Sequence, residues 1–177
     1  MAPNTPSMLR HGAEIVAADG SYLVGRVSNV LFSSTKGPTS MEGLAAADAL
    51  SDRVLDEYPD GVAMLMIAEA SSSMPSGEAR AKISAMTRRM APHIRAMALV
   101  FEGTGMWMSS MRMVSRTMMM AVPKKFPMDI FPTVEDAAPW ICAYLDNQMR
   151  VQPHELAAIV ARARGHEPDS GITHLAG

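Results

Sequence analysis

Two short, almost unbroken apolar runs, at 62–68 and 94–101, restrict the possible folds of this chain more than any other feature. Runs of this length without polar alternation are typical of strands that are covered on both faces. Between them, residues 79–90 place Ala79, Ile83, Met86 and Met90 on one helical face and basic side chains on the other. Because parallel strands need a crossover connection, this strand–helix–strand pattern predicts an α/β layer fold.

The segment before the first run predicts an antiparallel hairpin followed by a helix. A β-prone run at 13–16 leads into Asp19 and Gly20, and a strand over 22–32 follows them. An Asp-Gly pair favours a tight turn because both positions tolerate positive φ. Thr39 and Glu42 then have the spacing of a capping box, which predicts the start of a helix.

The segment after the second run predicts further strand–helix alternation. We expect a helix over 104–122, a short strand over 126–131 and a helix from Thr133 to about residue 146. Pro139 implies that this last helix either begins later or bends, because an internal proline removes one hydrogen bond. An additional helix follows, with Pro153 at its first position and Leu156, Ile159 and Val160 on one side.

These elements predict a single α/β domain. Its mixed sheet consists of an N-terminal hairpin and then strand–helix units, is flanked by helices, and is followed by an extra C-terminal helix. With 177 residues, of which 48% are hydrophobic and 19% charged, the chain can bury a core without disulfides. The expected organisation is a flexible N-terminus (1–12), the α/β domain (13–147), the appended helix (148–165) and a flexible tail (166–177).

The element order and the segment 62–145 resemble the STAS superfamily, including its SpoIIAA-like branch. The most similar piece is 126–137, which reads Phe-Pro-Met-Asp-Ile-Phe-Pro-Thr-Val-Glu-Asp-Ala and is similar to the last strand and helix start of such domains. The resemblance covers most of the chain. It implies a small sheet flanked by helices that is used mainly for regulatory contacts.

The same resemblance draws attention to two serines. Anti-sigma-factor antagonists of the superfamily carry Asp-Ser-Ser-Gly at the head of the second helix, and the first serine is phosphorylated. The corresponding stretch here is Met74-Pro75-Ser76-Gly77, which lacks the aspartate and the acceptor serine. Ser73 and Ser76 are therefore candidate phosphorylation sites that we interpret instead as helix caps, because serine is a preferred capping residue.

No constellation of residues predicts catalysis, a cofactor or a metal. Cys142 is the only cysteine, which excludes an internal disulfide and a cysteine-only zinc site. The formal net charge of −2 supplies no attraction to nucleic acid. The five histidines are scattered and form no metal-binding spacing: His11, His93, His154, His166 and His174.

The expected location is the cytoplasm. The segment 1–12 has no apolar core of signal-peptide length, and no run of about 18 apolar residues predicts a transmembrane helix. We therefore expect a soluble protein.

The most unusual number in the composition is 18 methionines, beside 4 Phe, 2 Trp and 3 Tyr. Methionine fills irregular gaps and also suits surfaces that adapt to a partner. On the expected helix over 104–122, Met106, Met113 and Met120 share nearly one azimuth and flank Arg116, so they form a second apolar patch. Either this patch is a partner or ligand surface, or a neighbouring helix covers it.

The function expected from these features is a non-catalytic regulatory or protein-interaction domain. It would act through Met106, Met113, Arg116 and Met120, with another protein or a second copy of the chain as its partner. The alternative is a carrier of a small apolar or lipid ligand in a methionine-lined groove.

Overall fold

The computed structural model describes residues 8–10, 12–103, 109–110, 126–145 and 151–165. Within them lies one seven-stranded sheet in which strands adjacent in sequence are adjacent in space. Its strands are β1 (Met8–Arg10), β2 (Ala13–Ala18), β3 (Tyr22–Val27), β4 (Val30–Thr35), β5 (Val62–Ala68), β6 (Ile94–Phe101) and β7 (Met128–Phe131). The helices are α1 (Met41–Glu57), α2 (Gly77–Met90), α4 (Val134–Leu145) and α5 (Pro153–Ala163).

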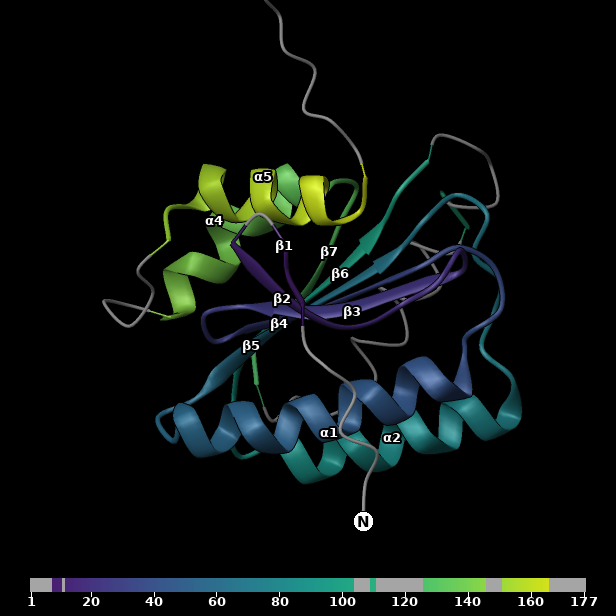
Figure 1. Cartoon of the computed structure of the whole chain (residues 1–177), viewed down its shortest axis with the longest axis horizontal. Helices are drawn as coiled ribbons and strands as arrows, with labels where there is room; N and C mark the ends of the chain where they lie inside the picture. Colours follow the sequence, from purple (N-terminus) through teal and green to yellow (C-terminus); the bar gives the residue numbers. More distant parts are fainter. Residues whose placement is uncertain (1–7, 11, 104–108, 111–125, 146–150, 166–177) are drawn as a thin grey trace, which may run out of the picture.

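The sheet lies between two pairs of helices, with α1 and α2 on one face and α4 and α5 on the other (Figure 1). β1 to β4 pair antiparallel, and β4 to β7 pair parallel. This arrangement confirms the mixed α/β sheet flanked by helices that the sequence predicts.

β5 is a central strand, as its unbroken apolar run predicts. It pairs with β4 on one side and β6 on the other, and Leu65 lies opposite Phe32 and Ala98. Leu65 and Ile67 belong to the core beneath α4 and α5, whereas Val62 and Met64 belong to the core beneath α1 and α2. Because helices cover both faces of the sheet, the residues that face either side are buried, and the strand is apolar along its whole length.

The single strand expected over 22–32 is wrong, because the chain reverses within it. Val27 pairs with Val30, and Ser28 between them has a φ of 54°. The side-chain amide of Asn29 donates to the Gly61 carbonyl at 3.2 Å, which holds the turn against the end of the loop before β5. A Ser-Asn turn between valines lacks the glycine that usually marks a hairpin, so the apolar pattern runs through it without a break.

The N-terminal segment expected to be flexible contains a strand. Met8–Arg10 pairs antiparallel with β2 and extends the hairpin by one strand. Gly12 has a φ of 92°, a conformation that permits this reversal and that L side chains rarely adopt.

Two helix starts differ from the expectation in detail. Ser40, not Thr39, caps α1, because its hydroxyl accepts the Gly43 N–H at 3.1 Å. α4 begins directly after Thr133 and continues through Pro139, so the alternative of a later start is wrong.

The core beneath α4 and α5 is filled by residues from both helices. Leu156 and Val160 of α5 are fully buried, and Ile141 of α4 packs in the same cluster. Pro153 opens α5, as the sequence predicts for the appended helix, and Gly165 follows the helix with a φ of 77°.

Candidate functional site

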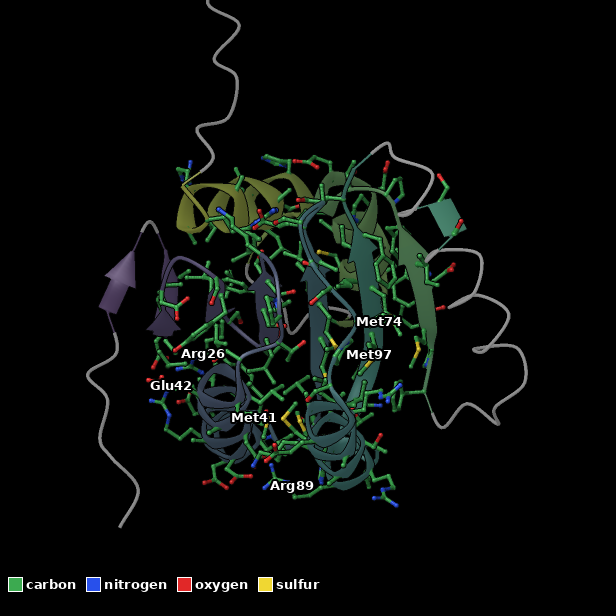
Figure 2. All side chains as sticks on the ribbon, turned by 90° about the vertical axis from the view of Figure 1, so that its right-hand side faces the viewer. Arg26, Met41, Glu42, Met74, Arg89 and Met97 are labelled. Carbon is green, nitrogen blue, oxygen red and sulfur yellow. The ribbon has the colours of Figure 1, made fainter. Side chains whose placement is uncertain are left out.

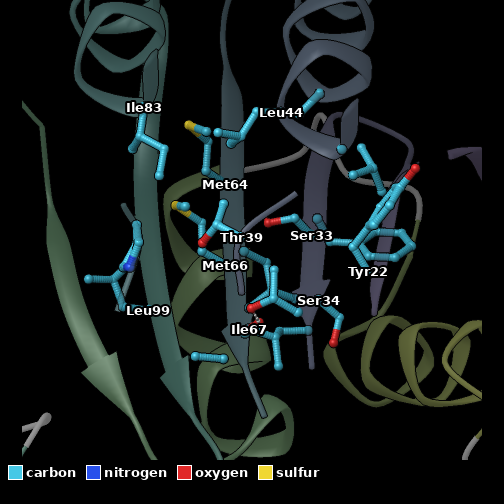
Figure 3. A pocket seen from close by; sticks show the side chains of 18 of the residues that line it. Tyr22, Ser33, Ser34, Thr39, Leu44, Met64, Met66, Ile67, Ile83 and Leu99 are labelled. Carbon is cyan, nitrogen blue, oxygen red and sulfur yellow. Dashed lines mark hydrogen bonds between the residues drawn. The ribbon is translucent and has the colours of Figure 1, made fainter. Parts of the chain in front are cut away.

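The two helix layers pack against the sheet at different distances. α4 lies close to β5, β6 and β7, and its buried alanines permit that approach. On the other face, α1 approaches β2 and β3, while the main helix contact of α2 is with α1. A cavity of about 540 Å³ lies between α1, α2 and the strands β3 to β6 (Figure 3). This volume falls within the range of small-molecule sites, about 300–1,000 Å³.

The close approach of α1 to β3 depends on a glycine. A Cβ atom added to Gly43 would lie 2.9 Å from the ring of Tyr22, which is shorter than ordinary contact. Gly43 therefore lets α1 lie against β3. Further along the sheet, the methionine side chains of β5 and β6 (Met64, Met66 and Met97) extend into the space between the sheet and the helices.

The floor of the cavity is apolar and rich in methionine. Met64 and Met66 point from β5 toward the cavity, and Leu99 lines it from β6 (Figure 3). Met66, Leu99 and Met128 are only half-buried, although they belong to a face of the sheet that helices cover. Their exposure shows that the helices do not fill the space above them.

The roof is more polar than the floor. Arg80, Ile83, Ser84 and Thr87 of α2 line the cavity, and their spacing of three and four residues places them on one helical stripe. Arg80 is exposed, as the sequence predicts for the basic face opposite the apolar stripe, and it also borders the cavity. Ala79, Met86 and Met90 are buried as expected.

One end of the cavity lies at the carboxyl ends of the parallel strands. α1 follows β4 and α2 follows β5, so both helices begin at this edge, and Thr39, Ser40 and Pro75 line the cavity there. Ligands of open α/β sheets commonly bind outside the carboxyl ends of the strands.

A second hollow, of about 260 Å³, lies near the end of α5 and contains paired charges. The Arg164 guanidinium contacts Glu102 at 2.5 Å and Glu69 at 3.1 Å. Burial acts to raise the pKa of Glu69, but the hydrogen bond from Ser34 and the charge of Arg164 outweigh it and hold that pKa below its ordinary value. Since these charges satisfy one another, the cluster has a structural role.

The candidate site residues from the sequence analysis do not line this cavity as a group. Met106, Met113, Arg116 and Met120 lie outside the described residues. The Ser76 hydroxyl caps α2 by accepting the Ala79 N–H at 3.1 Å, as expected. Ser73 is exposed and uses its backbone N–H to donate to the Gly37 carbonyl, so it is not a helix cap.

The structure offers no other reactive cluster in the part of the chain that it describes. There, no group of three or more His, Cys, Asp or Glu side chains could hold a metal ion. Cys142 is half-buried on α4, and burial raises the pKa of its thiol.

Sequence reasoning missed the cavity. Its signals were present but indirect: Ser33 interrupts the apolar face of β4, and Arg80, Ser84 and Thr87 form a polar stripe on α2. Each signal is ordinary when considered alone. Only the sheet register, which pairs Ser33 with Met66, places them around one space.

Comparison with known proteins identifies the fold. No protein-family model and no curated protein matches the chain. The crystal structure of an uncharacterized DUF3478-family protein from Shewanella loihica, described as having a SpoIIAA-like fold, is similar, with a TM-score of 0.50 and 14% sequence identity. The match covers 71% of this chain and 98% of that one. At this identity the similarity shows the fold.

Proposed function

The chain has a SpoIIAA-like fold, and we propose that it is a non-catalytic domain that binds a small apolar molecule in the cavity between the sheet and the helices α1 and α2. The observation that carries the proposal is the 540 Å³ space above half-buried Met66, Leu99 and Met128. This proposal puts the methionine-lined groove of the sequence analysis on the strands instead of on the segment 104–122.

Two physical arguments support binding over a packing defect. The apolar floor is removed from water when an apolar ligand covers it, so a ligand that binds only the folded protein stabilises that state. Methionine side chains have three rotatable bonds and adapt to irregular guests, which suits a floor formed by Met64, Met66 and Met97.

A substitution that fills the cavity tests the proposal. Ala47 of α1 is half-buried and lines the cavity, whereas Ala49 is exposed and does not. We expect the neutral dye N-phenyl-1-naphthylamine to bind the wild-type protein saturably, measured by its fluorescence. The variant Ala47→Phe should bind it much more weakly, because the ring occupies the ligand's space.

Ala49→Phe is the matched control and should bind the dye like the wild type. Thermal unfolding of all three proteins confirms that the variants are folded. Equal binding by the two variants, or no saturable binding by the wild type, would contradict a site in this cavity.

A second candidate function is regulatory contact with another protein or a second copy of the chain, through Met106, Met113, Arg116 and Met120. The SpoIIAA-like fold, a protein-interaction type, supports it. Replacing Met113 and Met120 with glutamine should preserve folding and weaken association, measured by light scattering after size-exclusion chromatography. An unfolded double variant, or unchanged association, would argue against this surface.

The remaining expectations belong to the same proposal. We place the protein in the cytoplasm and expect no nucleic-acid partner, in keeping with its formal net charge of −2. In the part of the chain that the structure describes, no helix is both long and apolar enough to span a bilayer.

A further inference from the structure

Arg80 is a charged residue in the lining of a cavity whose floor is apolar and whose other polar lining residues are uncharged. It occupies the first turn of α2, and because it is exposed as well as lining the cavity, it lies at the rim. Ile83 follows it on the same stripe, and Met66 and Leu99 lie on the floor below. A molecule inserted along this floor would therefore have one end near a positive charge.

The other basic residues of α2 that face α1 are neutralised. Lys82 contacts Asp48 at 3.0 Å, and Arg89 contacts both Asp48 and Asp52. Arg89 lies on the side of α2 away from the sheet (Figure 2). In contrast, the structure shows no ion pair for Arg80 among the residues that it describes.

The backbone adds positive potential at the same end of the cavity. α1 and α2 both begin at the carboxyl edge of the sheet, and residues at both helix starts line the cavity. The first turns of helices carry partial positive charge. Glu42 and Glu78, the acidic residues of these two turns, are exposed and lie outside the lining.

These observations define the chemistry of the occupant, given the apolar site proposed above. We propose that the cavity binds a long-chain carboxylate, such as a fatty acid, with its hydrocarbon chain on the methionine floor and its carboxylate beside Arg80. A guanidinium fits a carboxylate with two parallel hydrogen bonds, and one unpaired cation matches one negative charge. Because Arg80 is exposed and hydrated, a neutral ligand would gain no head-group contact from it, whereas a carboxylate would.

The experiment compares two probes that differ only in the head group. Dodecanoate and dodecanol are titrated below their aggregation limits by displacement of N-phenyl-1-naphthylamine. We expect the wild type to bind dodecanoate more tightly than dodecanol, and Arg80→Gln to lose about fivefold or more in dodecanoate affinity while binding dodecanol unchanged. Arg80→Lys should retain part of the preference, because it keeps the charge without the planar fork.

Arg88→Gln is the matched control, since Arg88 is exposed on the same helix and does not line the cavity. It should bind both probes like the wild type. Equal affinities of the wild type for the two probes, or an undiminished preference in Arg80→Gln, would overturn the carboxylate site and leave apolar binding intact. Failure of both probes to displace a dye that the wild type binds would also overturn the carboxylate proposal, whereas the apolar site itself is tested by the dye binding of Ala47→Phe.

Discussion

Arg164 joins the C-terminal helix to the carboxyl edge of the sheet. Its side chain is only 5% exposed, and it contacts Glu69 after β5 and Glu102 after β6. A buried guanidinium is tolerated when carboxylates satisfy its donors, but removal of one partner leaves the other charges uncompensated. The appended helix α5 is thus held by a polar contact as well as by its apolar face.

We expect Arg164→Met to lower the free energy of unfolding by roughly 3 kcal/mol, because Glu102 and Glu69 lose their shared guanidinium and Glu69 keeps the more distant Lys36 at 3.7 Å. Urea denaturation measures this change. Arg162→Met is the control on the same helix: Arg162 is exposed, and its replacement should change stability by less than about 0.5 kcal/mol. Similar effects of the two substitutions would show that the cluster does not stabilise the fold.

The pKa of Glu69 predicts a pH dependence of stability. Burial acts to raise this pKa, but the hydrogen bond from Ser34 and the charge of Arg164 lower it below its ordinary value of about 4.5. The ionised form is therefore favoured by folding, so its contribution is present above about pH 4.5 and is lost as the pH falls through the lower pKa of the folded state. Glu69→Gln should be less stable than the wild type at neutral pH, and this difference should shrink in acid.

Urea denaturation of both proteins between about pH 6 and about pH 3 measures this difference. If it stays constant over the whole range, the ionisation of Glu69 is not linked to folding.

At the scale of elements, the helix starts show which serine stabilises which helix. Ser76 caps α2 through its hydroxyl, whereas Ser73 contributes a backbone N–H to a bond with Gly37. Both serines precede the same helix, and the sequence alone does not distinguish their roles.

We expect Ser76→Ala to cost about 1 kcal/mol of stability, because the Ala79 N–H loses its acceptor. Ser73→Ala should leave the free energy of unfolding unchanged within about 0.5 kcal/mol, since its hydroxyl is not the cap. Thermal and urea unfolding provide the measurement. Stoichiometric phosphate at Ser76 in protein from its native cells, detected by mass spectrometry, would show instead that this serine serves as a switch.

At the scale of the whole molecule, the two faces of the sheet differ in how tightly they are covered. Leu65 is 0% exposed beneath α4 and α5, whereas its neighbour Met66 is half-buried and borders the cavity. A charge should therefore be tolerated far less at Leu65 than at Met66.

Leu65→Asp should therefore abolish folding, because it places an unpaired charge in a filled core. Met66→Asp should yield a folded but less stable protein, because a carboxylate at the cavity floor can be hydrated. It should no longer bind N-phenyl-1-naphthylamine, because the apolar dye would have to displace that water. Circular dichroism and thermal unfolding distinguish the two. A folded Leu65→Asp variant would contradict the assignment of the filled face, and an unfolded Met66→Asp variant would contradict a cavity beside Met66.

The order of strands and helices could be predicted from the sequence because it depends on local periodicity. A few consecutive residues are enough to indicate which faces are buried in β5, β6 and α2, because their apolar runs and helical stripe are local patterns. Periodicity did not predict the turn at Ser28 and Asn29 between β3 and β4, because the turn is marked by a backbone conformation and not by a change of hydrophobicity.

The cavity and the charge cluster were decided only by the tertiary structure. Gly43 sets the approach of α1 to Tyr22, and the register of β4 on β5 places Ser33 beside Met66. Arg164 contacts a carboxylate that lies 95 residues earlier in the chain. Side-chain packing between separate elements sets the distance between the helices and the sheet, and it brings the charge of a distant helix to the sheet edge. Local sequence patterns do not predict such packing.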